Sequence, residues 1–387
     1  AILVPGFGGF DLLGGLRYYE GVVEVLTAAG APRDLSVHFF PNLPTASVET
    51  RAHMLARWIG KRVYRNVIKP SDGDVIHLVG HSTGGLDIRA LLALLQSGQA
   101  LEAIDFLDED TPGARCDIVR DMRGSLRTAQ FLSTPHHGAT LAHLACELMP
   151  LPRCIAKKLF SGVRFLRPCG CGVAADLLEQ MPCCAGWEEA REAVVGTLRD
   201  ASRHGDPIEG ARGREAYYEL LRWLHEMAAD SGALASLSPA RPIWRPFGCG
   251  QPTLRPGAEV LRSSGVRARS IVTFAEVKGR DGTSLYAVLD RLIRRHAPGC
   301  PGDRAPEVEL LLEEGSRETI TPDHHDGIVS SLSMIWPDVE DCVAVRGDHA
   351  DVIGHYGPGP GDLLPSGAYF TEEQFAALWE SIRDYMA

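Results

Sequence analysis

Residues 74–95 read DVIHLVGHSTGGLDIRALLALL, and this stretch decides the fold. Asp74–Val79 is a short apolar run between two glycines, which suits a strand buried on both faces of a parallel sheet. Gly84–Leu95 returns to a helical pattern. The Gly-His-Ser-Thr-Gly turn between them needs glycines because the chain reverses too sharply for flanking side chains. The pattern predicts a nucleophilic Ser82 raised above the sheet edge; the alternative is a turn whose serine only caps the helix.

The same alternation of strand and helix patterns continues along the chain. Glu49–Ile68 is predicted to be a helix, because apolar residues recur at every fourth position from Leu55 to Val67. Thr371–Met386 is predicted to be the last helix, opened by a capping-box pattern. Strands separated by helices predict an α/β fold with a mostly parallel central sheet and helices on both faces. The remaining predicted strands are Ala1–Val4, Ser36–Phe40, Thr128–Leu132, Ala268–Phe274, Glu307–Leu312 and Cys342–Val345.

The middle of the chain departs from this alternation. Residues 141–256 carry helical patterns, such as Glu188–Leu198 and Arg214–Ala229, little strand signal and most of the 10 cysteines. We therefore predict one domain over residues 1–387, interrupted by a helical, cysteine-rich insertion at 141–256. Disulfides are the favoured state of the cysteines, with free thiols or a metal site as alternatives. The absence of C-x2-C pairs in the cysteine-rich stretch weighs against zinc.

Composition bounds the class of protein. With 387 residues and 45% hydrophobic side chains, the chain is typical of globular proteins and not of disordered or fibrous ones. A net charge of −11 disfavours nucleic acid as a partner. No run approaches about 18 apolar residues, so no transmembrane segment is predicted. The first residues show no signal-peptide pattern. Secretion is therefore an expectation that no targeting segment in this sequence supports directly.

A serine hydroxyl is a weak nucleophile and needs a base and an orienting carboxylate. In a hydrolase of this kind the order along the chain is serine, then acid, then histidine. Asp326 and His349 follow strand-like segments and satisfy that order. Local patterns leave other candidates open: Asp323, Asp338, Asp341, Asp348, Asp351, His324, His325 and His355.

Acyl transfer also needs backbone N–H groups directed at the developing oxyanion. One predicted donor is the amide of Thr83, directly after the nucleophile. The other is the amide of Phe7, in the loop Pro5–Gly9 after the first strand. This loop lacks the spacing of a phosphate-binding loop, which is the competing interpretation.

Several motifs occur in a characteristic order along the chain. Through them the chain resembles the bacterial lipases of the α/β-hydrolase superfamily, most closely the large-lid, heat-stable group. The resemblance implies an α/β-hydrolase fold with a helical lid insertion after Leu141. The motifs are Val4–Phe10, Tyr18–Gly21, Val79–Leu86, Ser133–Leu141, Asp326–Val329 with Ser333-Met334, and Asp348–Gly354.

The resemblance also assigns roles to individual residues. It implies that Asp326 and His349 are the triad acid and base, and that Phe7 supplies an oxyanion-hole amide. No cofactor is required. Asp351 matches a carboxylate ligand of a structural calcium ion in the family, although the second acidic ligand and the family's zinc ligands have no counterpart here. The oxyanion loop begins Pro5-Gly6 where the family usually has His-Gly.

Together these inferences predict a serine carboxylic-ester hydrolase. The expected substrates are acyl esters or lipids such as triacylglycerols, at an oil–water interface. A phospholipase, a polyester-degrading esterase and an acyltransferase would use the same residues. A non-catalytic binding protein on the same fold is the alternative from another class.

Overall fold

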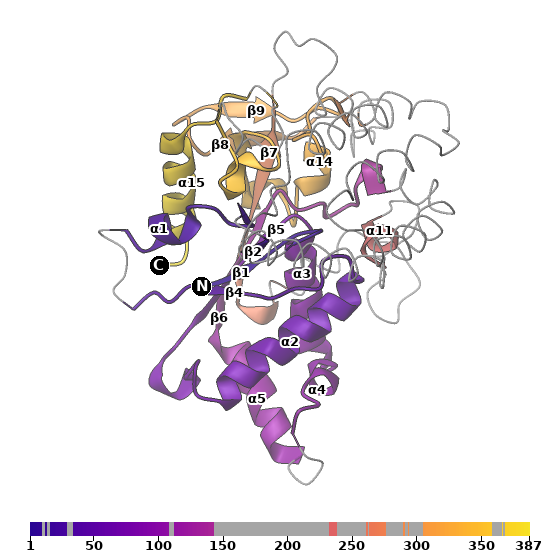
Figure 1. Cartoon of the computed structure of the whole chain (residues 1–387), viewed down its shortest axis with the longest axis vertical. Helices are drawn as coiled ribbons and strands as arrows, with labels where there is room; N and C mark the ends of the chain where they lie inside the picture. Colours follow the sequence, from indigo (N-terminus) through magenta and orange to yellow (C-terminus); the bar gives the residue numbers. More distant parts are fainter. Residues whose placement is uncertain are drawn as a thin grey trace, which may run out of the picture.

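A computed structural model of the chain contains one eight-stranded sheet (Figure 1). The structure describes residues 1–9, 12–13, 16–28, 34–107, 112–142, 232–237, 261, 263–275, 289–290, 293, 305–357, 366 and 368–387. In spatial order the strands are β4 (His38–Phe39), β1 (Ile2–Val4), β5 (Ile76–His81), β6 (Leu126–Leu132), β7 (Arg267–Phe274), β10 (Cys342–Arg346), β8 (Glu307–Leu310) and β9 (Arg317–Thr319). Neighbours from β4 to β8 are parallel, and only the β8–β9 pair is antiparallel.

Two hydrophobic cores lie on opposite faces of this sheet, because successive side chains of a strand point to opposite faces. In β1, Ile2 and Val4 join the core that is shared with α2, α3 and α5, whereas Leu3 joins the core that is shared with α1 and α15. Figure 1 shows α2 and α5 on one side and α15 on the other. The described helices are α1 (Val22–Leu26), α2 (Val48–Tyr64), α3 (Thr83–Ser97), α4 (Ala100–Ala103), α5 (Pro112–Ser125), α11 (Gly232–Leu237), α14 (Ser331–Met334) and α15 (Glu372–Asp384).

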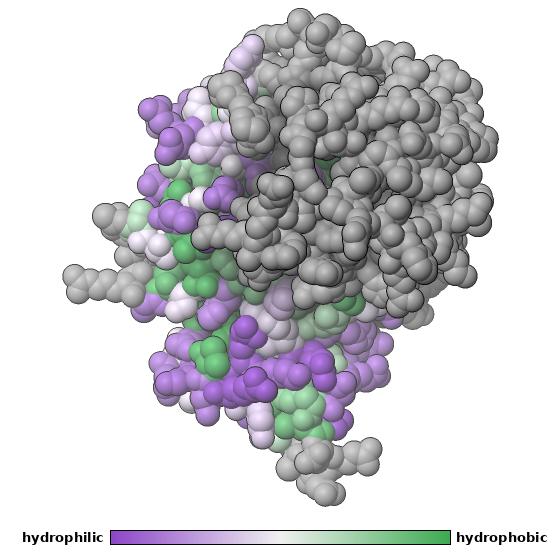
Figure 2. Space-filling view, in the orientation of Figure 1, coloured by the Kyte–Doolittle hydropathy of each residue, from purple (hydrophilic) through white to green (hydrophobic). Residues whose placement is uncertain are grey.

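Smaller elements complete the described part of the chain. A two-stranded ribbon joins β2 (Leu12–Leu13) to β3 (Leu16–Arg17). Single 3-10 turns occur at Pro70–Asp72, Val339–Asp341 and Asp351–Ile353. Among the described residues, no helix is both long and apolar enough to cross a membrane. Figure 2 shows a largely hydrophilic surface over α2 and α5, as expected for helices that bury one face.

The sheet, its two layers of helices and the strand-to-helix junction at residue 82 constitute the predicted α/β-hydrolase fold. The central strand β5 is buried along its whole length, as its apolar run indicates. The final helix begins at the predicted capping box, in which Thr371 and Gln374 bond reciprocally.

One predicted helix is too long. The helix α2 ends at Tyr64, and Val67 lies outside it with 54% of its surface exposed, so its assignment to the apolar stripe is wrong. The cause is local: Asn66 adopts a left-handed backbone with φ of 54°, and the amides of Val67 and Ile68 both bond to the carbonyl of Arg62. That geometry terminates a helix.

The predicted insertion at 141–256 lies outside the described residues, apart from 141–142 and α11. The helical patterns at Glu188–Leu198 and Arg214–Ala229 fall in the part that is not described. Two cysteines are described and both are free thiols: Cys116 is exposed, and burial raises the pKa of Cys342 to about 12. The predicted disulfides among the other cysteines therefore stay a prediction.

Both edges of the sheet are short. At one edge β4 contributes two residues, and at the other β9 contributes three. The charged residues Arg317 and Glu318 lie in β9, and Arg346 of β10 forms ion pairs with Glu318 at 2.7 Å and with Glu313 at 2.9 Å.

Candidate active site

Ser82 lies in a strained turn between β5 and α3. Its backbone has φ 53° and ψ −128°, a conformation that costs about 1–3 kcal/mol and persists only where the surroundings enforce it. The Ser82 amide bonds to the carbonyl of Leu132 on β6 at 2.8 Å. A side chain at Gly84 would collide with the carbonyl oxygen of Val4, and one at Gly80 would lie 2.5 Å from the amide nitrogen of Gly85. The glycines of the motif are therefore steric requirements of this turn.

Thr83 is the first residue of α3. Amides in the first turn of a helix have no acceptor within the helix, and the helix dipole places partial positive charge there. Among the described residues the Thr83 amide has no hydrogen-bond acceptor. This N–H, directly after Ser82, is available to a negatively charged oxygen.

The loop after β1 passes directly over Ser82. A side chain at Gly6 would lie 2.6 Å from the Cβ of Ser82, so only glycine permits this approach. The Gly6 carbonyl accepts the Gly9 amide at 3.0 Å, which closes a turn. In a trans peptide the next N–H points opposite to that carbonyl, so the Phe7 amide is directed out of the turn. Within the described part of the chain it donates to no other group.

A fully buried ion pair fixes the same loop. Arg51 of α2 contacts Asp87 of α3 at 2.7 Å, and both side chains are completely buried. Arg51 also donates to the carbonyl oxygen of Pro5 at 2.9 Å. Removing either partner would leave an uncompensated buried charge, which typically costs about 3–5 kcal/mol. The pair therefore ties the loop to the two helices α2 and α3 beside Ser82.

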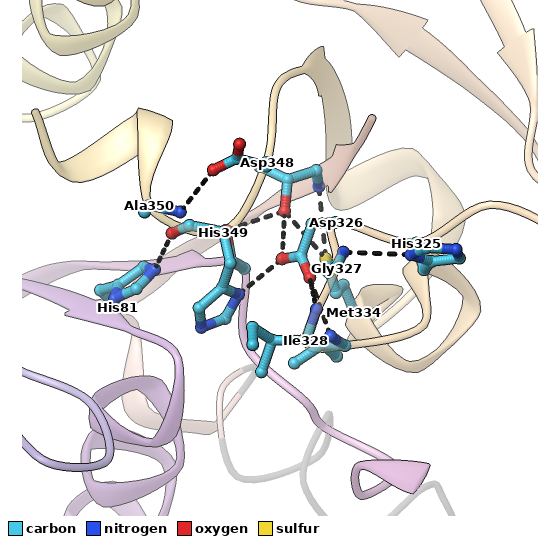
Figure 3. A network of polar contacts seen from close by, with 12 residues as sticks. His81, His325, Asp326, Gly327, Ile328, Met334, Asp348, His349 and Ala350 are labelled. Atoms are coloured by element: carbon cyan, nitrogen blue, oxygen red, sulfur yellow. Dashed lines mark hydrogen bonds and ion pairs between the residues drawn. The ribbon is translucent and has the colours of Figure 1, made fainter. Parts of the chain in front are cut away.

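Asp326 and His349 form a hydrogen-bonded pair. The Nδ1 atom of His349, in the loop after β10, lies 2.6 Å from Oδ2 of Asp326 (Figure 3). The His349 amide also donates to the Asp326 carbonyl at 2.9 Å, so the backbone of the two loops is joined as well. Because a carboxylate oxygen only accepts, Nδ1 carries the proton and Nε2 is left with a lone pair in the neutral ring.

The carboxylate of Asp326 is completely buried and held on both oxygens. Its Oδ1 accepts the amides of Ile328 at 3.0 Å and Val329 at 2.8 Å. Its Oδ2 accepts the Thr273 hydroxyl at 2.8 Å, besides His349. Thr273 lies at the carboxyl end of β7, so this contact locates Asp326 at that edge of the sheet. Four donors therefore fix the orientation of the carboxylate.

The ring of His349 lies beside His81, the residue that precedes Ser82. The ring centroids of His349 and His81 are 4.6 Å apart. Figure 3 shows the second ring nitrogen of His349 directed away from Asp326. Ser82, the Phe7 loop and the Asp326–His349 pair thus share the carboxyl edge of the sheet, formed by the ends of β1, β5, β7 and β10.

The competing histidines have other partners. His325 lies 2.7 Å from Asp290 through Nε2, and its Nδ1 accepts the Gly327 amide. His324 accepts the amide of Thr321. The ring of His355 bonds to the carbonyl of Tyr18 at 3.2 Å. Of the four histidines considered, His349 is the one that the structure pairs with Asp326.

Asp351 is buried, and its Oδ2 accepts the amide of Asp348 at 2.7 Å. Calcium takes 6–8 oxygen ligands. Among the described residues there is no group of three or more His, Cys, Asp or Glu side chains that could hold a metal ion. The contact of Asp351 with the Asp348 amide stabilises a turn, and its role as a calcium ligand stays a prediction.

Sequence reasoning missed the residues that support the site. Thr273 left a signal, because it is a polar residue at the carboxyl end of a buried predicted strand. Arg51 and Asp87 gave no signal in the sequence. A single charged residue in a helix usually faces solvent, and the two residues that pair here are 36 positions apart. Such contacts become visible only in the folded chain.

Four histidines near the sheet resist protonation; His77, His81 and His136 are buried, and His137 is half-buried. Burial lowers the pKa of His137 and His77 to about 4, and it places the pKa values of His81 and His136 well below the ordinary range. The charge of Arg89 lowers the pKa values of His136 and His137 further. These rings are neutral in the folded protein at neutral pH.

We expect the free energy of unfolding to fall as the pH drops from about 6.5 to about 4. In this window His137 is protonated in the unfolded chain but stays neutral in the folded chain, because its pKa is lower there. Acidification therefore favours unfolding. The loss is up to about 1.4 kcal/mol per pH unit for this histidine and levels off below about pH 4. Urea denaturation at pH 7.5, 6.5, 5.5 and 4.5 measures it. The His137→Gln variant, which keeps a donor for the Ile335 carbonyl, should show a shallower slope; an unchanged slope would contradict the assignment.

No protein-family model matches the chain, and no curated protein matches it. Among solved structures it is similar to lipase 1 from Pelosinus fermentans, with 15% identity over 99% of this chain and 97% of the lipase and a TM-score of 0.47. It is also similar to the mature form of lipase BlEst2 from Bacillus licheniformis, with 14% identity over 91% of this chain and 85% of that one and a TM-score of 0.41. A metagenomic carboxyl esterase shares 14% identity over 100% of this chain and 74% of its own, with a TM-score of 0.42.

Proposed function

We propose that the chain is a serine carboxylic-ester hydrolase with Ser82 as nucleophile, His349 as general base and Asp326 as the orienting acid. The observation that carries this proposal is the Asp326–His349 pair, joined at 2.6 Å beside a strained strand-to-helix turn with serine at its apex. Buried acids, bases and nucleophiles in this combination perform acyl transfer on several unrelated folds.

In the proposed reaction the Ser82 hydroxyl attacks the ester carbonyl while Nε2 of His349 takes its proton. Asp326 keeps the proton of His349 on Nδ1 and stabilises the imidazolium that forms. His349 then gives its proton to the leaving alcohol as the carbon–oxygen bond breaks, which leaves the acyl group on Ser82. Water, activated by His349 in the same way, releases the carboxylic acid and restores Ser82.

The amides of Phe7 and Thr83 are the proposed donors to the oxyanion. Both N–H groups flank Ser82 and neither is used within the described part of the chain. Removing one such donor typically lowers kcat about 10²–10³-fold. The Arg51–Asp87 pair supports this role, because Arg51 holds the carbonyl that precedes Gly6.

The proposed substrates are water-insoluble acyl esters such as triacylglycerols. The Phe7 side chain packs against an apolar cluster beside the nucleophile that includes Leu237 of α11, inside the predicted lid insertion. Apolar surroundings of the proposed oxyanion loop favour substrates that carry an acyl chain. A lid that shifts at a lipid surface would admit the substrate, and secretion would bring the enzyme to it. The cluster comprises Val48, Leu86, Ala139, Ala142 and Leu237.

A phospholipase, a polyester-degrading esterase and an acyltransferase would use the same three residues. Comparing rates on short esters, triglyceride emulsions, phospholipid vesicles and polyester films separates these substrate classes. An acyltransferase would form a new ester when an alcohol acceptor is added.

A fluorophosphonate probe tests the proposed nucleophile directly. We expect one probe molecule per folded chain, with the phosphonate on Ser82 by peptide mass spectrometry, because the probe captures only a serine activated by a base. Addition of p-nitrophenyl ester should slow labelling, and heat-denatured protein should not be labelled. A folded chain that is not labelled would favour the non-catalytic binding protein.

A further inference from the structure

Tyr18 connects the loop over Ser82 to the residue that precedes Ser82. Its hydroxyl accepts the Gly6 amide at 2.8 Å and lies 2.6 Å from Nδ1 of His81. The Tyr18 side chain is buried, and a side chain at Gly6 would lie 2.5 Å from its hydroxyl oxygen. The peptide that precedes the Phe7 amide is therefore packed against this hydroxyl.

His81 continues the connection to the proposed base. Its Nε2 lies 3.0 Å from the backbone carbonyl oxygen of His349 (Figure 3), and its ring is 1% exposed. The segment around Tyr18 is also bonded to the chain after His349: the ring of His355 contacts the Tyr18 carbonyl, and the Glu20 amide donates to the Ile353 carbonyl at 2.9 Å. The oxyanion loop and the loop of the base are thus linked by contacts of these two side chains.

The positions of the protons in this chain of contacts follow from elementary rules. A carbonyl oxygen only accepts, so Nε2 of His81 must carry the proton that bonds to His349. In a neutral ring Nδ1 is then an acceptor, and it takes the single hydroxyl proton of Tyr18. Burial lowers the pKa of His81 and raises the pKa of Tyr18 well away from neutrality, so both groups stay uncharged. The three hydrogen bonds therefore have one direction: the Gly6 amide donates to Tyr18, the Tyr18 hydroxyl to His81, and the His81 ring to the His349 carbonyl.

We propose that Tyr18 and His81 are positioning residues that hold the oxyanion loop and the general base in register across Ser82. This inference rests on the proposed hydrolase function and adds two residues that act through others. Tyr18 fixes the orientation of the Gly6 amide, and with it the peptide next to the Phe7 donor. His81 fixes the backbone of His349, whose ring must meet Ser82.

Tyr19 provides a matched comparison. It is also a buried tyrosine, and its hydroxyl donates to the Val4 carbonyl at 2.8 Å. Val4 lies in β1, within the sheet, and the Tyr19 hydroxyl contacts the backbone of His81, whereas the Tyr18 hydroxyl contacts its ring. A phenylalanine at either tyrosine removes one buried hydroxyl, so a purely structural effect should be similar in the two variants.

The first experiment compares Tyr18→Phe with Tyr19→Phe in the full chain. We expect Tyr18→Phe to lower kcat on a p-nitrophenyl ester about 10–100-fold, the range typical of groups that orient catalytic residues, with KM changed less than about 3-fold. Tyr19→Phe should keep kcat within about 3-fold of the unsubstituted protein. Fluorophosphonate titration at saturation gives the fraction of competent chains, and kcat is expressed per labelled site.

The affinity for a boronic acid that mimics the tetrahedral intermediate is a second measurement. A change in protein stability alone does not alter it. The inhibition constant of the boronic acid should rise in Tyr18→Phe by the same factor as kcat/KM falls, because both depend on the geometry of the oxyanion donors.

For His81, the Gln variant retains an amide that can donate to the His349 carbonyl, whereas the Leu variant does not. We expect His81→Gln to keep at least about 5-fold more kcat per labelled site than His81→Leu.

The outcomes separate the two levels of inference. If the unsubstituted protein neither hydrolyses esters nor is labelled at Ser82, the hydrolase function fails. If it is active and Tyr18→Phe matches Tyr19→Phe in kcat per labelled site and in boronic acid affinity, the positioning role of Tyr18 is overturned while the function stands. Equal kcat values for His81→Gln and His81→Leu would overturn the role of His81.

Discussion

Replacing Ser82 with alanine is expected to lower kcat on a p-nitrophenyl ester about 10⁵–10⁶-fold, the scale of losing the nucleophile in a serine hydrolase. The reason is chemical, because alanine at the apex of the turn between β5 and α3 has no hydroxyl to attack the ester. Initial rates at saturating ester, with purified variant free of unsubstituted protein, measure the effect. Residual activity above about 1% would place the nucleophile elsewhere.

A second serine variant controls for loss of a buried hydroxyl. Ser125 is buried at the end of α5 and donates to the carbonyl of Asp121 at 2.7 Å, away from the carboxyl edge of the sheet. We expect Ser125→Ala to retain kcat within about 2-fold. Matching far-ultraviolet circular dichroism for the two variants would show that the loss in Ser82→Ala is not a loss of folded protein.

Replacing Asp326 with asparagine is expected to lower kcat about 10⁴-fold with the fold intact. The amides of Ile328 and Val329 both donate to Oδ1, so the asparagine oxygen must occupy that position. The NH2 group then takes the place of Oδ2 and faces Nδ1 of His349, where it can only donate. His349 is forced to carry its proton on Nε2, the nitrogen that must accept the proton of Ser82.

Asp348 offers the matched control for this variant. It is also buried, and its Oδ1 accepts the amides of Ala350 at 2.9 Å and Asp351 at 3.1 Å, a cap that asparagine preserves. We expect Asp348→Asn to retain kcat within about 5-fold when both variants are assayed at the same pH. An Asp326→Asn enzyme that keeps more than about 10% of kcat would contradict the role proposed for the carboxylate.

The strand-to-helix turn at Ser82 could be predicted from the sequence because its constraints are local. The glycines around Ser82 are required by contacts within a few residues and with the end of β1, and the neighbouring apolar patterns identify a buried strand and a helix. The strand β5, with its continuous apolar run, and the helix α3, with its helical pattern, were predictable for the same reason. The strand β9 was not predictable, because its three residues are polar and mostly exposed and give no apolar pattern.

The acid and the supporting contacts could not be derived from local pattern. Several aspartates follow the last predicted strands, and resemblance, not spacing, selected Asp326. In the structure Asp326 is distinguished by Thr273, 53 positions away, and by His349, 23 positions away. The Tyr18–His81 contact spans 63 positions. Information of this kind resides in the tertiary arrangement and has no counterpart in a short window of sequence.

The two short edges of the sheet bear on how copies of this protein meet one another. An outermost strand offers unpaired backbone groups that a neighbouring molecule can use to extend the ladder, which is a common start of aggregation. Here the described outer strands offer only two and three residues, and ionic side chains crowd the second of them. An incoming strand would gain few backbone bonds and would have to displace charges to gain them. The described edges of the sheet therefore offer a neighbouring copy little backbone to pair with.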